Sequence, residues 1–99
     1  MRIIARKTLR GFWELRKYAA AEQPLRAWFR EVSKADWSGP ADVKAAYRSA
    51  SIVGDNRVVF NIAGNKYRLV VQINYKIKFV HLRFVGTHAE YDKIDAQTI

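Results

Sequence analysis

The sequence predicts a single α+β domain, with two N-terminal helices packed on one face of a mostly antiparallel, twisted sheet and a short C-terminal helix. From Arg57 onward, three consecutive segments alternate apolar and polar side chains, the period-2 pattern of strands with one buried face. Upstream of them, apolar residues recur at helical spacing. Ninety-nine residues supply one core but not two, so the domain spans residues 1–99.

The first element is predicted to be a short strand at residues 2–5, where Ile3 and Ile4 supply β-branched side chains. A helix is expected from about residue 7 to residue 21, because this segment is rich in helix-forming residues. Its apolar side is formed by Leu9, Phe12 and Trp13, with Arg16 beside them.

The second helix is predicted to begin at Pro24, since proline is favoured in the first turn of a helix. Four apolar residues then recur at the spacing i, i+3, i+4 and i+7, namely Leu25, Trp28, Phe29 and Val32. This spacing indicates one buried stripe. A tryptophan can also stack on a nucleic-acid base, but on such a stripe Trp28 is expected to belong to the core.

The segment from residue 38 to residue 57 is the least periodic part of the chain and is predicted to be a connector. Ser38, Gly39 and Pro40 indicate a turn, and residues 41–47 a short helical piece. The sequence Gly54-Asp55-Asn56 is typical of the turn that precedes a strand.

The strand pairing can be predicted residue by residue. With Gly64-Asn65 as a two-residue turn, the first hairpin pairs Ile62 with Tyr67, Phe60 with Leu69 and Val58 with Val71. With Tyr75-Lys76 as the second turn, Leu69 faces Leu82 and Val71 faces Val80. These pairs form one apolar face, which packs on the helices. The other face is then an open, polar groove that carries Arg57, Asn61, Arg68, Gln72, His81 and Arg83.

In this register Arg68 lies beside Arg83. Like charges directly opposite each other destabilise a sheet, so the pair indicates a bound anion. Two alternatives remain: both side chains point into solvent, or the register slips by one residue and every side chain changes face.

The last helix is predicted from a capping box. Thr87-His88-Ala89-Glu90 fits the pattern S/T-x-x-E, so a short helix is expected to begin after Thr87. His88 then lies in its first turn, and Tyr91 follows at i+3 on the same side.

The composition favours a polyanionic partner. Eighteen lysines and arginines against nine acidic residues give a formal charge of +9, which suits nucleic acid, although an anionic membrane surface or an acidic protein fits as well. The chain has no cysteine, no apolar run of membrane-spanning length and no signal-peptide pattern, so a cytoplasmic protein is expected.

The residue types available suit RNA cleavage without a metal or another cofactor. The two histidines, His81 and His88, lack the closely spaced carboxylates that a zinc site uses. In RNA the 2′-hydroxyl attacks the adjacent phosphate, so the protein supplies a base, an acid and cations. Arg68 and Arg83 suit the phosphate, because guanidinium groups bind phosphate oxygens in pairs. The candidates for proton transfer are His88 and Tyr91, with His81 as a second base or a solvated side chain.

Two stretches carry a family resemblance. FNIAGNKYRLVV at residues 60–71 and LRFVGTHAEYDKI at residues 82–94 resemble the HigB-type toxins of bacterial toxin–antitoxin pairs. The resemblance implies a RelE-like fold, cleavage of messenger RNA on the translating ribosome, and inhibition by a HigA-type antitoxin.

The resemblance also implies site residues. Arg68 matches the arginine of the Gly-Asn-x-x-Arg strand, and the R-x-V-x-T-H-x-x-Y-D ending is matched by Arg83, Thr87, His88, Tyr91 and Asp92. The catalytic set is thus Arg68, Arg83, His88 and Tyr91, and which residue is acid or base stays open. RNA contacts are expected from Arg57, Asn61, Lys66, Gln72 and His81. The alternative is a non-catalytic module that binds RNA or DNA in the same groove.

Overall fold

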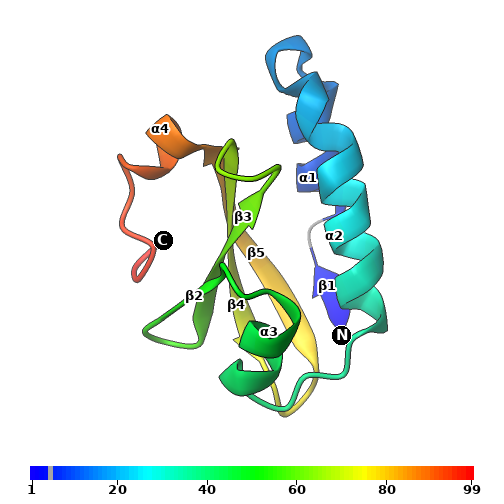
Figure 1. Ribbon diagram of the computed structural model, residues 1–99, viewed down its shortest axis with the longest axis vertical. Helices are drawn as coiled ribbons and strands as arrows, with labels where there is room; N and C mark the ends of the chain where they lie inside the picture. The colour runs from blue at the N-terminus through cyan, green and yellow to red at the C-terminus, as the bar shows by residue number, and fades with distance from the viewer. Residues whose placement is uncertain (5) are drawn as a thin grey trace.

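The structure, a computed structural model that describes residues 1–4 and 6–99, confirms the α+β class. Its sheet has the strand order β1-β5-β4-β3-β2, and the helices α1 and α2 lie on one side of it (Figure 1). The C-terminal segment lies on the opposite side (Figure 1). None of the helices in the described part of the chain has both the length and the apolar character that crossing a membrane requires.

The first strand is confirmed, but the first helix is interrupted. Strand β1 (Arg2–Ile4) pairs in parallel with β5 (Phe79–Thr87), and Ala5, the last residue of the predicted strand, lies outside the described residues. The segment predicted as one helix is α1 (Arg6–Glu14) followed by a 3-10 helix, η1 (Arg16–Ala21). Leu15 between them is extended, with φ −70° and ψ 129°, so the chain changes direction there.

Helix α2 (Glu22–Lys34) begins two residues before Pro24 and carries the predicted buried stripe. Leu25 and Val32 are fully buried, and Trp28 is 2% exposed with its ring in edge contact with Phe60. The prediction that Trp28 belongs to the core is therefore confirmed. Leu9, Phe12 and Trp13 of α1 are buried in the same core.

The predicted connector contains the expected short helix and also a strand that was not expected. Helix α3 (Pro40–Ala46) has proline at its first position, and β2 (Ser51–Val53) pairs antiparallel with β3 (Arg57–Ile62). Three residues are too few to show a period-2 pattern, which is why the sequence did not reveal β2. Asp55 and Asn56, in the turn between the two strands, both have left-handed φ values, 59° and 58°.

The first hairpin has the predicted register. Between β3 and β4 (Tyr67–Asn74), Val58 pairs with Val71, Phe60 with Leu69 and Ile62 with Tyr67. The turn differs in detail, because its left-handed residues are Ala63 and Gly64, with φ 54° and 67°. The apolar face predicted from this pairing is buried against the helices.

The predicted register of the second hairpin is wrong. Val71 pairs with Leu82 and Leu69 with Val85, so Arg68 lies opposite Gly86 and not beside Arg83. Tyr75 and Lys76 are not turn-forming residues of the glycine or asparagine type, and the chain turns over four residues up to Lys78, which has φ 61°. The Asn74 side chain supports this turn by accepting a hydrogen bond from the main-chain nitrogen of Ile77.

A β-bulge at Arg83 completes the shift. One residue is left unpaired between the pair Val71–Leu82 and the pair Val70–Phe84. Such a bulge turns two consecutive side chains to the same face. Arg83 donates a hydrogen bond to Gln72, and Phe84 packs on Val70, both on the face away from the helices.

That face is not the open groove predicted from the sequence. A second apolar cluster covers its centre; it consists of Val59, Val70 and Ala96, with Val53, Phe84, Tyr91, Ile94 and Ile99 packed against it. Residues 92–99 thus lie across β3 and β4. The accessible side chains of this face lie mainly along β5 and β1, among them Arg83 and His81, and at the end of β4, where Asn74 is exposed.

Candidate active site

Four of the predicted site residues lie where β4 begins and β5 ends: Lys66, Arg68, His88 and Tyr91. Tyr67 pairs with Thr87, and Arg68 pairs with Gly86, so Arg68 lies next to the start of helix α4 (His88–Tyr91). The predicted capping box is present: the Thr87 hydroxyl accepts a hydrogen bond from the main-chain nitrogen of Glu90, and the Glu90 carboxylate accepts one from that of Thr87. These bonds fix His88 and Tyr91 at the two ends of a one-turn helix.

Arg68 is a buried cation that has no counter-charge among the residues that the structure describes. The residue is 9% exposed, and its guanidinium carbon lies 6.0 Å from the centre of the Tyr91 ring. It donates only long hydrogen bonds, of 3.3 to 3.4 Å, to the main-chain oxygens of Asn65 and Tyr67 and to the Asn65 side chain. Within residues 1–4 and 6–99, no carboxylate lies within ion-pair distance of it. A buried charge needs a partner, and a phosphate would supply one.

His88 is accessible at the edge of this group. Its side chain is 54% exposed, and Nδ1 lies 3.7 Å from the Asp92 carboxylate, one helical turn further on. Its main-chain nitrogen donates a hydrogen bond to the main-chain oxygen of Lys66, which ties α4 to the turn before β4. The Lys66 ammonium lies 6.0 Å from the centre of the Tyr67 ring, so a second cation stands at the same end of the sheet.

Glu90 and Tyr18 form a link that sequence reasoning missed. The Tyr18 hydroxyl donates a hydrogen bond of 2.6 Å to Glu90, and its ring stacks on Phe12 at 4.1 Å. The Tyr18 hydroxyl, followed by the Thr87 main-chain N–H, lowers the pKa of the Glu90 carboxyl. The same hydrogen bond, with burial, raises the pKa of Tyr18. The capping box revealed Glu90, but 72 residues separate it from Tyr18, and no local pattern indicates the pairing.

Gly86 lets the end of β5 pack closely against α4. A Cβ atom at this position would lie 2.6 Å from the Phe84 ring and 3.0 Å from the Glu90 carboxylate. A side chain here would therefore displace either the ring or the carboxylate that caps α4. Because Gly86 is the residue paired with Arg68, no side chain stands beside Arg68 on β5 at this position.

Three other predicted residues, Arg57, Gln72 and Arg83, lie toward the other end of β4 and are connected by hydrogen bonds. Arg83 donates to Gln72 at 2.7 Å, and Gln72 donates to Asp55. Asp55 also accepts from Arg57, which is 6% exposed and donates to the main-chain oxygen of Ile99. Arg57 is thus buried and already paired, while Arg83 is exposed.

The remaining two residues divide between the groups. Asn61 faces Arg68 across β3 and β4, and its amide donates a hydrogen bond to the main-chain oxygen of Ser49. His81 pairs with Gln72 across β4 and β5, and its ring lies 6.1 Å from that of Phe79. The structure therefore brings Arg68, His88 and Tyr91 together and places Arg83 apart from them.

Comparison with known proteins covers the segments that build this site. The profile of the family HigB_toxin, described as the RelE-like toxic component of a toxin-antitoxin system, matches residues 21–94. The mRNA interferase toxin HigB of Escherichia coli K12 is 31% identical over 94 residues, which cover 93% of this chain and 88% of that protein. The mRNA interferase HigB of Shigella flexneri shows the same identity and coverage. That of Escherichia coli O6:H1 is 27% identical over 81 residues, which cover 80% of this chain and 79% of that protein.

The matched region contains the Arg68 strand, the β5 ending and α4, so it includes Arg68, His88 and Tyr91, while Tyr18 precedes it. The family profile spans well over half of the chain, and the relative from strain K12 passes 30% identity over nearly all of it. The resemblance seen in the sequence is therefore confirmed, and the chain belongs to the HigB family of RelE-like toxins.

Proposed function

We propose that this protein is an endoribonuclease that cleaves messenger RNA on the translating ribosome and thereby inhibits translation. The observation that carries the proposal is Arg68: a buried guanidinium without a carboxylate partner among the described residues, next to Tyr91 and paired across β4 and β5 with Gly86, two residues before His88. The relatives that bear the name mRNA interferase support it.

The proposed reaction uses the RNA's own 2′-hydroxyl. This oxygen attacks the adjacent phosphorus, a base accepts its proton, and an acid gives a proton to the leaving 5′-oxygen. Arg68 stabilises the negative charge that grows on the phosphate oxygens. His88 and Tyr91 transfer the two protons, and the accessible imidazole, with the Asp92 carboxylate 3.7 Å from Nδ1, suits a group that gains and loses a proton.

We propose a role for Arg83 that differs from the one expected from the sequence. Arg83 is held by Gln72 on the exposed part of β5 and stands apart from Arg68, so we assign it to binding the RNA strand. In place of Arg83, we assign Lys66 as the second cation near the reacting phosphate. The main-chain oxygen of Lys66 accepts the hydrogen bond from the His88 main-chain nitrogen.

We further propose that a HigA-type antitoxin neutralises the protein in the cytoplasm, where its ribosomal substrate lies. The family is described as the toxic component of a toxin–antitoxin system, which requires a cognate inhibitor. The formal charge of +9 suits an acidic partner as well as RNA.

The test is cleavage itself. Ribosomes that translate a defined message are mixed with the protein, and the 3′ ends of the message are mapped. New ends are expected with the wild-type chain and with Arg10→Ala, a control on the exposed side of α1, and a loss of about 10² to 10³ in rate is expected with Arg68→Ala.

Two further outcomes bear on the mechanism and on the alternative. A single 2′-deoxy substitution at the mapped cut should abolish cleavage there, because the attacking oxygen is gone. A message that stays whole while translation stops would overturn the endonuclease in favour of a module that only binds RNA.

A further inference from the structure

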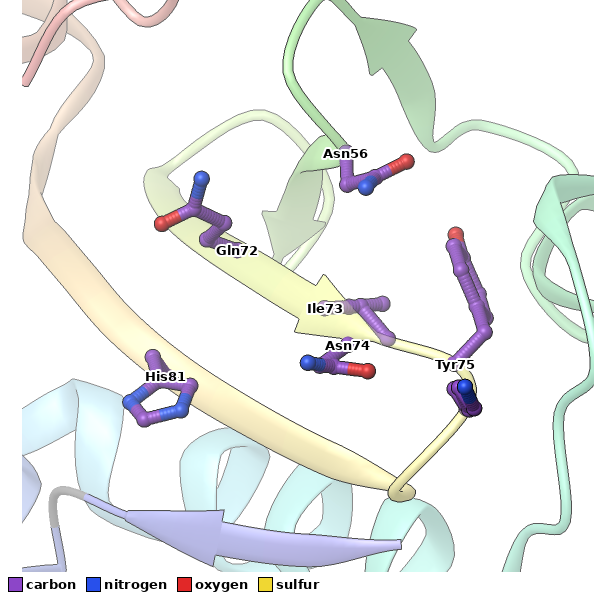
Figure 2. Close-up of a pocket in the computed structure, with 7 residues that line it drawn as sticks. Asn56, Gln72, Ile73, Asn74, Tyr75 and His81 are labelled. Carbon is purple, nitrogen blue, oxygen red and sulfur yellow. The ribbon is translucent and has the colours of Figure 1, made fainter.

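A cavity of about 480 Å³ opens at the far end of β4 from Arg68. Figure 2 shows its walls: Asn56 from the turn between β2 and β3, Gln72 and Asn74 from β4, and His81 from β5. Ile73, which is 1% exposed, and half-buried Tyr75 also border it, and Lys76 contributes a cation. No carboxylate is among the side chains that line it.

The hydrogen-bonding groups of this cavity are only partly used. The Asn74 side-chain oxygen accepts a hydrogen bond from the Ile77 main-chain nitrogen, and its NH₂ group has no hydrogen-bond partner among residues 1–4 and 6–99. In the part of the chain that the structure describes, the Asn56 amide and the His81 ring nitrogens form no hydrogen bond. Unused donors and acceptors that face one cavity indicate a polar ligand.

The walls of the cavity are fixed before any ligand arrives. Gln72 is held at both ends of its amide, by Arg83 and by Asp55. Asn56 has a left-handed φ of 58°, and its main-chain oxygen accepts a hydrogen bond of 2.9 Å from the nitrogen of Ile73. Asparagine tolerates this backbone conformation in turns, so the position of Asn56 is set by the turn between β2 and β3.

The surroundings add a flat, cationic surface. The His81 ring lies 6.1 Å from Phe79, and the Arg2 guanidinium carbon lies 5.6 Å from the centre of the Phe79 ring. Asparagine amides pair with the edges of nucleobases, and aromatic rings stack on their faces. An isolated phosphate would need a denser set of cations than Lys76 offers.

We propose that this cavity binds one base of the RNA strand whose phosphate lies at Arg68. The inference rests on the proposed function and deepens it, because it adds a subsite for base selection away from the cleaved bond. Thr87 and His81 are six residues apart on β5, roughly 20 Å at about 3.3 Å per residue. Exposed Arg83, between them, offers a charge to the connecting backbone.

Base removal in an uncleavable RNA tests the subsite. Single-stranded RNAs with every 2′-hydroxyl methylated carry one abasic position, moved stepwise along the strand, and their dissociation constants are measured at low salt. Wild-type protein is expected to show one position, several nucleotides from the base next to Arg68, where base loss weakens binding by about tenfold.

Two variants remove the unused groups with little disturbance. Asn56→Gly keeps the left-handed backbone, and Asn74→Asp keeps the oxygen that accepts from Ile77 while replacing the NH₂ group. In both variants, loss of the base at that position should no longer change the dissociation constant. Gln23→Ala, which removes an exposed amide on α2, should show the same dependence on abasic position as wild type.

The outcomes separate this inference from the function on which it rests. An unchanged abasic pattern in both variants, or wild-type protein that binds no RNA at low salt, would overturn the base subsite. A subsite that responds as expected in a protein that cuts no message on ribosomes would keep the subsite and overturn the endonuclease.

Discussion

At the scale of single residues, the main correction concerns Arg68. The sequence predicted repulsion between Arg68 and Arg83 as the mark of an anion site. The structure separates the two and instead buries Arg68 on the Tyr91 ring without a carboxylate among the described residues. The need for an anion therefore comes from burial of one charge, a property that local sequence patterns do not reveal.

Arg68→Met should separate function from stability. Methionine fills a similar length without the charge, so the folded state no longer contains a buried cation that lacks a counter-ion. The melting temperature is expected to equal or exceed that of wild type, while cleavage falls by about 10² to 10³. Thermal unfolding followed by circular dichroism, together with single-turnover cleavage, measures both. A folded variant with wild-type cleavage would remove Arg68 from the site.

The roles of His88 and Tyr91 in proton transfer can be separated by single-turnover cleavage. The rate is expected to fall in His88→Gln, which removes the imidazole, and in Tyr91→Phe, which removes only the hydroxyl group. A message with sulfur in place of the leaving 5′-oxygen needs no acid, because a thiolate leaves without a proton, so it should restore the rate of the variant that lost the acid and not that of the variant that lost the base. Full rate with the ordinary message in His88→Gln would leave proton transfer to Tyr91 and other groups.

At the scale of elements, α4 depends on Tyr18 for its position. The pKa of Glu90 is lower in the folded state, so the ionised carboxylate stabilises the fold. This stabilisation is fully present above the unfolded-state pKa of about 4.3 and is lost as pH falls through the lower folded-state pKa. The raised pKa of Tyr18 adds a contribution that is present below about pH 10 and lost as pH rises through its folded-state value.

Tyr18→Phe should thus melt below wild type at neutral pH, with a difference that narrows below pH ~4 and above pH ~10. The measurement is the melting temperature across pH. Tyr75→Phe is the matched control, because its hydroxyl is buried without a partner in the part of the chain described, and its loss should not lower stability. Equal effects of the two substitutions at neutral pH would contradict a stabilising bond to Glu90.

The core predicted from the sequence makes a simpler prediction. Leu69 is fully buried between the sheet and the helices, and Trp28 is 2% exposed. Leu69→Ala and Trp28→Ala should each lower the free energy of unfolding by about 2 to 5 kcal/mol. Urea denaturation would show it, with the exposed Leu15→Ala as control. A near-native midpoint for either variant would contradict this packing.

The elements also show which parts of a fold a sequence predicts. The first hairpin was correct because its alternating apolar residues and Gly64-Asn65 agree on one register. The second was wrong because no residue type announces the bulge at Arg83 or the four-residue turn before β5. The break at Leu15 also has no proline or glycine at that position. The capping box, by contrast, depends on two residues three positions apart and was found directly.

At the scale of the whole molecule, the charge was predictable and its distribution was not. Residues 92–99 cover the centre of the face that the sequence left open, and Arg57 is buried beneath them. The accessible cations on this side lie along β5 and β1, where Arg83 and Arg2 are exposed, with Lys66 at the end near His88. A polyanion would therefore approach along β5 and the start of β4, where Arg68 lies, and not across the part of β3 and β4 that residues 92–99 cover.

This distribution makes a prediction about the antitoxin. If an acidic antitoxin approaches the exposed cations, attraction at long range speeds the encounter, and salt weakens that attraction. The association rate constant should fall markedly between about 0.05 and about 0.5 M salt, with a smaller change in the dissociation rate constant. Stopped-flow mixing of the separated proteins measures both, and Arg83→Gln with Arg2→Gln should reduce the salt dependence. Association that ignores salt would point instead to an apolar contact, for which the groove between α1 and α2 beside Trp13 and Phe29 is the accessible surface.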